Sequence, residues 1–285
     1  MKINYSNEPK NNFPTNKKQL IYLCSFGQDY FDMAKMLIWS IRNMGNFSDN
    51  IVVLVDPETF EKNQNFSDVQ LVKFDQSVQN PQLTKVLAKD YIGWEKYEQV
   101  LYLDTDILVV NNLAPIFSMA QNKILCFEDV FPLERWWFAW KKDMPPDLAK
   151  KLGVNSGIFC GKSKNMSSLL NHWQQEHNDL VKSLNVPHDQ PAFNKIVFEH
   201  LEQFQIVPNI ENIEKYTHIV PTRRATRWCL NQGNEKVCHN TTFLHFIWMK
   251  QRPKLEKMKK VFDTLKQDGK ENIGNITYYE KVWKW

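Results

Sequence analysis

Glycine is scarce in this sequence and is not arranged in a phosphate-binding pattern. Only nine of the 285 residues are glycine, and they form neither a Gly-x-Gly-x-x-Gly motif nor a Walker-type loop. Both patterns use glycine to let the backbone approach a phosphate closely. Their absence argues against a nicotinamide-dependent dehydrogenase and against a P-loop enzyme.

Long apolar runs and paired cysteines are missing as well. The apolar segments are far shorter than the roughly 20 residues of a membrane-spanning helix, and the polar segment 1–18 contains no apolar signal core. We therefore expect a cytoplasmic protein. The cysteines are odd in number and include no Cys-x-x-Cys pair, which favours reduced thiols over a zinc site. They are Cys24, Cys126, Cys160, Cys229 and Cys238, of which the last two are spaced so that they could close a loop.

Positive charge is concentrated in the last quarter of the chain. Residues 215–285 carry 15 Lys and Arg against 6 Asp and Glu, although the whole chain has a net charge of only +4. Such a basic region suits phosphates, whether on a nucleotide, a nucleic acid or a membrane surface. No recognised nucleic-acid-binding motif accompanies the charge, so we expect no nucleic-acid partner.

Apolar runs alternate with helical patterns along most of the chain. The apolar runs predict strands over 20–25, 51–55, 69–74, 100–103, 124–127, 156–160 and 243–246. Apolar residues at helical spacing and cap signals predict helices over 30–42, 83–97, 169–184, 190–200 and 253–267. This alternation is typical of an α/β fold whose mostly parallel sheet has helices on both faces. We expect one domain over 1–285, with a polar extension at 1–18 and a basic, aromatic C-terminal helix and tail at 253–285.

Two aspartates follow the strand predicted over 100–103. On a strand, the spacing of Asp104 and Asp106 would place both carboxylates on one face, where they repel each other unless a cation lies between them. Oxygen ligands of this kind suit magnesium or manganese. The alternative is a simple strand-to-turn junction. A haloacid-dehalogenase-type phosphatase is disfavoured, because its motif needs Thr or Val where this chain has Leu108.

Four ordered motifs and a later His-Phe pair carry a resemblance to a known family. The motifs are Leu83-Thr84-Lys85, Leu103-Asp104-Thr105-Asp106, Val154-Asn155-Ser156-Gly157-Ile158-Phe159 and His188-Asp189-Gln190-Pro191-Ala192-Phe193-Asn194, and the pair is His245-Phe246. Over residues 20–253 the chain resembles glycosyltransferase family 8, which has the GT-A fold and includes glycogenin-like and lipopolysaccharide galactosyl- and glucosyltransferases. The resemblance implies transfer of a hexose from a nucleotide-sugar, with a UDP-sugar as the expected donor. The expected acceptor is a glycan or a lipid-linked saccharide.

The resemblance also implies a metal site and a basic contact to the donor. Asp104, Asp106 and His245 match the family's three metal ligands, which suit Mn²⁺ or Mg²⁺. Taken alone, His245 is better interpreted as a satisfied core histidine than as a metal ligand. Lys85 matches a basic residue near the donor sugar or phosphate, although a solvated helix lysine is the simpler interpretation.

The remaining motif residues are implied to surround the donor sugar. Asn155 and Ser156 resemble a turn that lines the sugar pocket, and Asp129 falls near an acid that helps to bind the sugar. Asp189 is expected to bind sugar hydroxyls and Gln190 to stabilise the anomeric centre in a retaining reaction. Two plain structural interpretations stay open: an Asn-Ser-Gly turn, and a helix cap at Asp189 followed by proline in the first turn.

The segment after His245 departs from the family pattern. The family has a glycine and then Lys-Pro-Trp, which holds the diphosphate. Here Trp248 replaces the glycine and Lys250 comes one residue early. Lys250 or Arg252 is therefore expected to contact the diphosphate.

An aromatic and basic cluster at 135–142 has three interpretations. Its sequence is Arg-Trp-Trp-Phe-Ala-Trp-Lys-Lys. It could be a platform on which acceptor sugars stack, a peripheral membrane anchor, or rings packed under a loop. The basic C-terminal region fits the membrane interpretation, whereas Arg223, Arg224 and Arg227 could hold an anionic acceptor.

Two alternatives to a retaining transferase stay open. An inverting enzyme would need a carboxylate base, for which Asp129 and Glu128 are the candidates. A catalytically silent sugar- or phosphate-binding protein on the same fold would be expected to have a broken metal triad.

Overall fold

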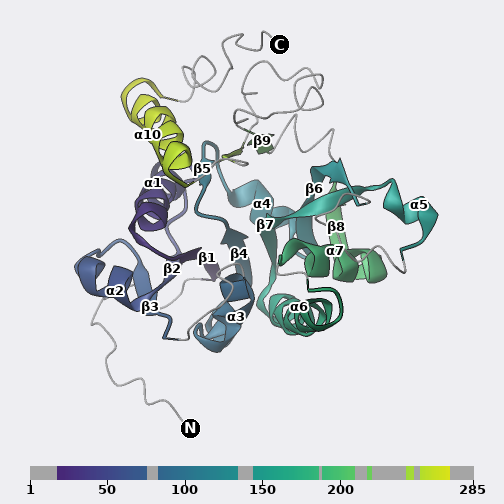
Figure 1. Cartoon of the computed structure of the whole chain (residues 1–285). Coiled ribbons are helices and arrows are strands. Elements are labelled where there is room, and N and C mark those ends of the chain that lie inside the picture. Colours follow the sequence, from purple (N-terminus) through teal and green to yellow (C-terminus); the bar gives the residue numbers. More distant parts are fainter. Residues whose placement is uncertain are drawn as a thin grey trace.

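The computed structural model describes residues 18–75, 83–133, 144–185, 188–208, 217–219, 242–246 and 251–269 (Figure 1). A seven-stranded sheet runs through this described part, in the order β3-β2-β1-β4-β7-β6-β8. Its strands are β1 (Gln19–Ser25), β2 (Asn50–Val55), β3 (Gln70–Lys73), β4 (Gln99–Leu103), β6 (Ile124–Pro132), β7 (Leu152–Lys162) and β8 (Phe204–Val207). Neighbouring strands are parallel except at β7, which is antiparallel to both β4 and β6. The predicted mostly parallel sheet is confirmed.

The apolar strands place side chains in two separate cores. Leu20 and Tyr22 of β1 belong to one core, whereas Ile21 and Leu23 belong to the other. Successive side chains of a strand point to opposite faces of the sheet, so a continuous apolar run buries both faces. The sheet therefore needs helices on both sides.

Helices supply that cover on each face. One face is covered by α1 (Gln28–Asn43), α4 (Ala114–Met119) and α10 (Gln251–Asp268), and the other by α3 (Thr84–Leu87), α6 (Ser163–Leu184) and α7 (Gln190–Glu199). Helix α10 lies alongside α1 (Figure 1). Two short helices, α2 (Pro57–Asn63) and α5 (Pro146–Ala149), complete the helices described. None of the described helices combines the length and apolar character needed to cross a bilayer.

A second, smaller sheet brings a late segment of the chain beside the strand that follows Asp106. It contains β5 (Ile107–Val109), β10 (Phe243–His245) and β9 (Thr217–Ile219), in the order β5-β10-β9. Because β10 pairs antiparallel with β5, His245 lies opposite Ile107. The distance of more than 130 residues between them in sequence is closed by this pairing.

One predicted helix is wrong, and the predicted thiols are partly confirmed. Residues 83–97 form α3 and two separate 3₁₀ turns, η2 (Ala88–Asp90) and η3 (Trp94–Lys96), instead of one helix. Gly93 interrupts them with a ψ of 87°, outside the helical range. Val86 and Trp94 still pack in the same core. Short helical turns therefore bury the apolar side chains that a single helix was predicted to bury. The thiols of Cys24, Cys126 and Cys160 are free; Cys229 and Cys238 lie outside the described residues.

Candidate functional site

The two aspartates lie in the turn between β4 and β5. Strand β4 ends at Leu103, and Asp104 to Asp106 form the turn before β5 begins at Ile107. The prediction that a strand presents both carboxylates on one face is therefore wrong, but the turn still brings them together. This position is the carboxyl end of a strand in a mostly parallel sheet, where ligands bind in such folds.

His245 completes a group of three potential metal ligands. One ligand atom from each of Asp104, Asp106 and His245 lies within 4.8 Å of the others. The backbone N–H of Phe246 donates to the carbonyl oxygen of Asp106 over 2.9 Å. The pairing of β10 with β5 therefore fixes the imidazole next to the carboxylates, and His245 is not merely a core histidine.

Asp106, whose side chain is 13% exposed, is the more constrained of the two carboxylates. Its Oδ1 lies 3.3 Å from Nε2 of His245 and has no hydrogen-bond partner within the described residues. Its Oδ2 accepts a hydrogen bond from the ammonium of Lys254. Burial by itself would raise the pKa of Asp106, but Lys254 and His245 together hold it well below the usual range of an aspartate. Asp106 is therefore an anion at neutral pH.

These three side chains fit a divalent metal ion. Two carboxylates and one imidazole form a mixed oxygen and nitrogen donor set that suits Mn²⁺, and also Mg²⁺. A buried carboxylate oxygen without a hydrogen-bond donor is costly unless a cation binds there, and Oδ1 of Asp106 is such an atom. The residues present therefore match the ion that the motif predicted.

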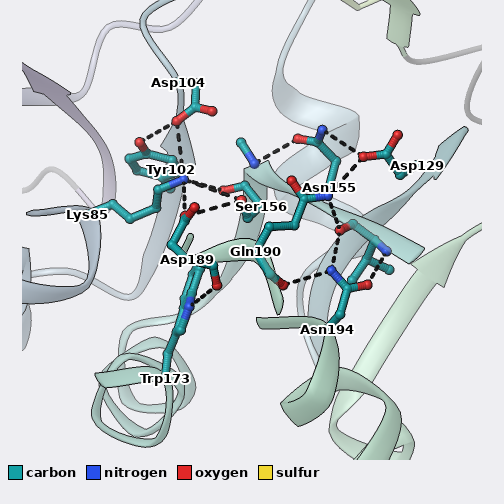
Figure 2. A network of polar contacts seen from close by, with 12 residues as sticks. Lys85, Tyr102, Asp104, Asp129, Asn155, Ser156, Trp173, Asp189, Gln190 and Asn194 are labelled. Carbon is teal, nitrogen blue, oxygen red and sulfur yellow. Dashed lines mark hydrogen bonds and ion pairs between the residues drawn. The ribbon is translucent and has the colours of Figure 1, made fainter. Parts of the chain in front are cut away.

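Lys85 connects the metal site to the start of α7 (Figure 2). Its Nζ lies 2.8 Å from Oδ2 of Asp189 and 3.5 Å from Oδ1 of Asp104, and it donates to the carbonyl oxygen of Ser156 over 3.1 Å. The side chain is only 7% exposed. Burial would lower the pKa of Lys85, but Asp104 and Asp189 raise it above its usual value. Lys85 is thus a buried cation and not a solvated helix lysine.

Asp189 uses its carboxylate for this ion pair and not for capping a helix. It occupies the position before α7, yet its side chain accepts no capping hydrogen bond. It instead accepts a hydrogen bond of 3.3 Å from Oγ of Ser156 and pairs with Lys85. Its backbone carbonyl accepts from Nε1 of Trp173 over 2.9 Å. The cap interpretation is wrong, whereas the proline in the first turn is present as Pro191.

Gln190 is held by its amide group (Figure 2). Its Nε2 donates to Oδ2 of Asp129 over 2.9 Å and to the carbonyl oxygen of Val154 over 3.2 Å. Nδ2 of Asn155 lies 3.5 Å from the same Asp129 oxygen. Because both amide hydrogens of Gln190 are donated, its Oε1 is the polar atom that can face a bound molecule. Asp129 therefore contacts the residue predicted to be catalytic.

Asn155, Ser156 and Gly157 belong to strand β7 and do not form the predicted turn. Oδ1 of Asn155 accepts from the N–H of Gly157 over 2.7 Å, and the N–H of Asp104 donates to the carbonyl oxygen of Gly157 over 2.8 Å. A Cβ atom at position 157 would lie 2.5 Å from Oδ2 of Asp104. Glycine is therefore required for the close approach of β7 to this carboxylate.

Two contacts of the site were missed in the sequence. The hydroxyl of Tyr102 donates to Oδ1 of Asp104 over 2.5 Å, and the spacing of two residues on a strand could have indicated it. Lys254, which contacts Asp106, gave no such signal because lysines are frequent throughout this basic segment.

Of the two predicted diphosphate contacts, the structure describes only Arg252, and this residue pairs with surface carboxylates. Arg252 has a side chain that is 72% exposed and lies 3.8 Å from Asp29 and 3.4 Å from Glu256. Lys250 lies outside the described residues. The same is true of the cluster at 135–142, of Arg223, Arg224 and Arg227, and of the C-terminal tail beyond 269.

One known protein family matches the part of the chain that contains most of this site. The sequence model of the family described as nucleotide-diphospho-sugar transferase matches residues 95–261, more than half of the chain. The matched segment begins before β4 and extends into α10, so it includes the three potential metal ligands, Gln190 and Lys254. Among curated proteins, none matches the sequence.

Proposed function

Because the chain belongs to the nucleotide-diphospho-sugar transferase family, we propose that it transfers a hexose from a UDP-sugar to a hydroxyl of a glycan or lipid-linked saccharide, with retention of configuration. The GT-A-type fold and the transfer of a sugar follow from the family. The finer assignment to a family-8-type enzyme is our proposal. The observation that carries it is the group of Asp104, Asp106 and His245, with atoms within 4.8 Å of one another, which Lys85 links to Asp189.

The metal ligands act on the leaving diphosphate in this proposal, and the buried cation Lys85 positions two of the carboxylates around it. A Mn²⁺ or Mg²⁺ ion held by Asp104, Asp106 and His245 would supply positive charge for the diphosphate of the donor. Lys85 keeps Asp104 and Asp189 in place whether or not a donor is present, because its ammonium lies between them. The side chains that meet the donor are in this way preorganised.

Asp189 and Gln190 act at the sugar in this proposal. Asp189 accepts hydrogen bonds from sugar hydroxyls, and Oε1 of Gln190 faces the positive charge that develops at the anomeric carbon. The bond between that carbon and the diphosphate oxygen breaks, and its electron pair leaves with the diphosphate. The acceptor oxygen bonds to the anomeric carbon on the same face, and its proton passes to the leaving phosphate.

The hydrogen bond that Asp129 accepts argues against this residue as the base of an inverting reaction. An inverting enzyme needs a carboxylate that is free to take the acceptor proton. Asp129 instead accepts from Nε2 of Gln190 over 2.9 Å, which engages it in positioning a neighbour. Inversion, with Glu128 or Asp129 as base, is the alternative that the anomeric configuration of the product distinguishes.

Release of UDP from a panel of UDP-sugars, with Mn²⁺ and with EDTA, tests the proposal. We expect metal-dependent hydrolysis of one donor by the wild type and its loss in Asp106→Ala and His245→Ala. His200→Ala is the matched control, because His200 follows the end of α7 and its side chain is 43% exposed. Donor binding without any turnover, including in the presence of candidate acceptors, would favour the silent binding protein. No binding of UDP and Mn²⁺ would refute the transferase.

A further inference from the structure

A lysine contacts the metal-ligand group. Lys254 lies in the first turn of α10, and its ammonium donates to Oδ2 of Asp106. Both side chains are only 13% exposed. The contact joins two segments that are 148 residues apart in sequence, so it is a product of the tertiary fold.

The two lysines of the site pair with different carboxylates. Lys85 is paired with Asp104 and Asp189, and Lys254 is paired with Asp106. A buried carboxylate without a partner is strongly destabilising. Lys254 therefore gives Asp106 the positive charge that it requires in the protein without metal.

A divalent ion at Asp106 would compete with the ammonium of Lys254 for the same carboxylate. Two cations on one carboxylate in a partly dry site repel each other, and Oδ1 of Asp106 is the oxygen without a hydrogen-bond donor. A metal ion held by Asp106 and His245 would therefore lie close to the ammonium of Lys254.

We infer that Lys254 is a built-in substitute for the metal ion: it neutralises Asp106 in the metal-free protein and is displaced when the ion binds. This inference rests on the proposed metal site and adds a competitor to it. Metal binding then breaks the ion pair between Lys254 and Asp106. In the absence of a nucleotide, the affinity for the ion is therefore lower than it would be if the same three ligands had no competing lysine.

The structure allows the lysine to move while its helix stays in place. Met258, Val261 and Leu265 anchor α10 in the core, and each is at most 2% exposed. Lys254 itself lies in the first turn of the helix, and its ammonium is at the end of a flexible four-carbon side chain. The displacement of Lys254 is therefore a rotation of a side chain and needs no unfolding of α10.

Titration of the nucleotide-free protein with Mn²⁺, followed by the electron paramagnetic resonance signal of free Mn²⁺, tests the competition. We expect Lys254→Gln to bind Mn²⁺ at least about tenfold more tightly than the wild type, because the competing pair is absent. Lys254→Arg keeps a cation and should bind with wild-type affinity. Lys259→Gln removes the same charge from an exposed position of the same helix and should also leave the affinity unchanged.

Thermal unfolding separates this role from a purely structural one. In EDTA, Lys254→Gln should melt at a lower temperature than the wild type, because Asp106 loses its partner. Saturating Mn²⁺ should remove the difference. Lys254→Met, which keeps the apolar stem, repeats the measurement if the glutamine variant does not fold.

Two kinds of result would overturn the inference, and they are distinguishable. Equal Mn²⁺ affinity in Lys254→Gln and wild type, or a melting difference that persists at saturating Mn²⁺, would leave the proposed transferase intact and remove the competition. Equal Mn²⁺ affinity in the wild type and Asp106→Asn would mean that these residues hold no metal. The proposed function would then fail together with the inference.

Discussion

The ammonium of Lys85 lies 2.8 Å from the carboxylate of Asp189, and both side chains are more than 90% buried. The pair joins α3 to the start of α7, two elements on the same face of the sheet. It also reaches Asp104 in the turn after β4. Lys85 therefore links the turn that holds Asp104 to the start of α7.

Replacing Lys85 should destabilise the protein far more than replacing an exposed lysine. Lys85→Met leaves Asp104 and Asp189 without their cation, and loss of one partner of a buried pair typically costs about 3–5 kcal/mol. Lys62→Met is the control, because Lys62 pairs with Glu58 on the surface at 2.6 Å and such pairs contribute about 1 kcal/mol or less. Urea unfolding measures both values, and similar losses in the two variants would contradict the prediction.

Gly157→Ala should impair the metal site with little loss of fold. The added methyl group would lie 2.5 Å from Oδ2 of Asp104 and 2.9 Å from Oδ1 of Asn155, so Asp104 must shift. We expect Mn²⁺ affinity to fall at least about tenfold, because a ligand is displaced.

Gly161→Ala is the matched control on the same strand. Its methyl group would meet Ile124 at 3.2 Å and Met166 at 3.4 Å, away from the metal ligands. It should lower the free energy of unfolding and leave the Mn²⁺ affinity unchanged. A parallel loss of metal affinity in both variants would show that the effect is a general loss of packing.

Asp129→Ala should reduce turnover through Gln190. Without Asp129 the amide of Gln190 loses its 2.9 Å partner, and misplacement of a reacting group by about 1 Å can reduce the rate about 100-fold. We expect kcat to fall about 10- to 100-fold while Mn²⁺ affinity is unchanged. In the double variant with Gln190→Ala the two losses should not add, because both act on one group. Additive losses would show that Asp129 acts independently of Gln190.

Asp56 should make stability depend on acid pH. It caps α2 by accepting from the N–H of Thr59 over 2.9 Å, and it also accepts from the N–H of Gly27 over 2.7 Å. Burial by itself raises the pKa of Asp56, but these hydrogen bonds and that of the Thr59 hydroxyl bring it below its usual value.

A lowered pKa stabilises the folded state above the unfolded value of about 3.9, and this contribution is lost as the pH falls through the folded value. The difference in free energy of unfolding between wild type and Asp56→Asn should therefore be constant from about pH 5 to 7 and shrink below about pH 4. Urea unfolding across this range measures it. A difference that is the same at every pH would contradict the assignment.

The fold could be predicted where local pattern and tertiary context agree. The strands over 51–55 and 100–103 are continuous apolar runs, and the structure confirms them as β2 and β4. Strands β6 and β7 extend beyond the predicted 124–127 and 156–160 because their pairing with each other recruits polar residues such as Glu128. Pairing between distant segments leaves no periodic signal in either one.

The site could be predicted as a set of residues but not as a set of contacts. The Asp-x-Asp spacing and the ordered motifs indicated Asp104, Asp106 and His245, which the structure places together. The sequence left open whether Asp189 caps a helix, because the competing partner Lys85 is 104 positions earlier. Lys254 had no distinguishing pattern, and only the packing of α10 reveals its contact.

The antiparallel strand β7 also fixes the contact between Asp104 and Gly157 independently of the connection that precedes the strand. Its register with β4 sets the hydrogen bond between Asp104 and Gly157, so residues 53 positions apart are held to each other at 2.8 Å. The chain between β6 and β7, residues 133–151, is not part of that register. Insertions, deletions or grafts there should therefore leave the approach of Gly157 to Asp104 unchanged, over evolutionary time or in the laboratory.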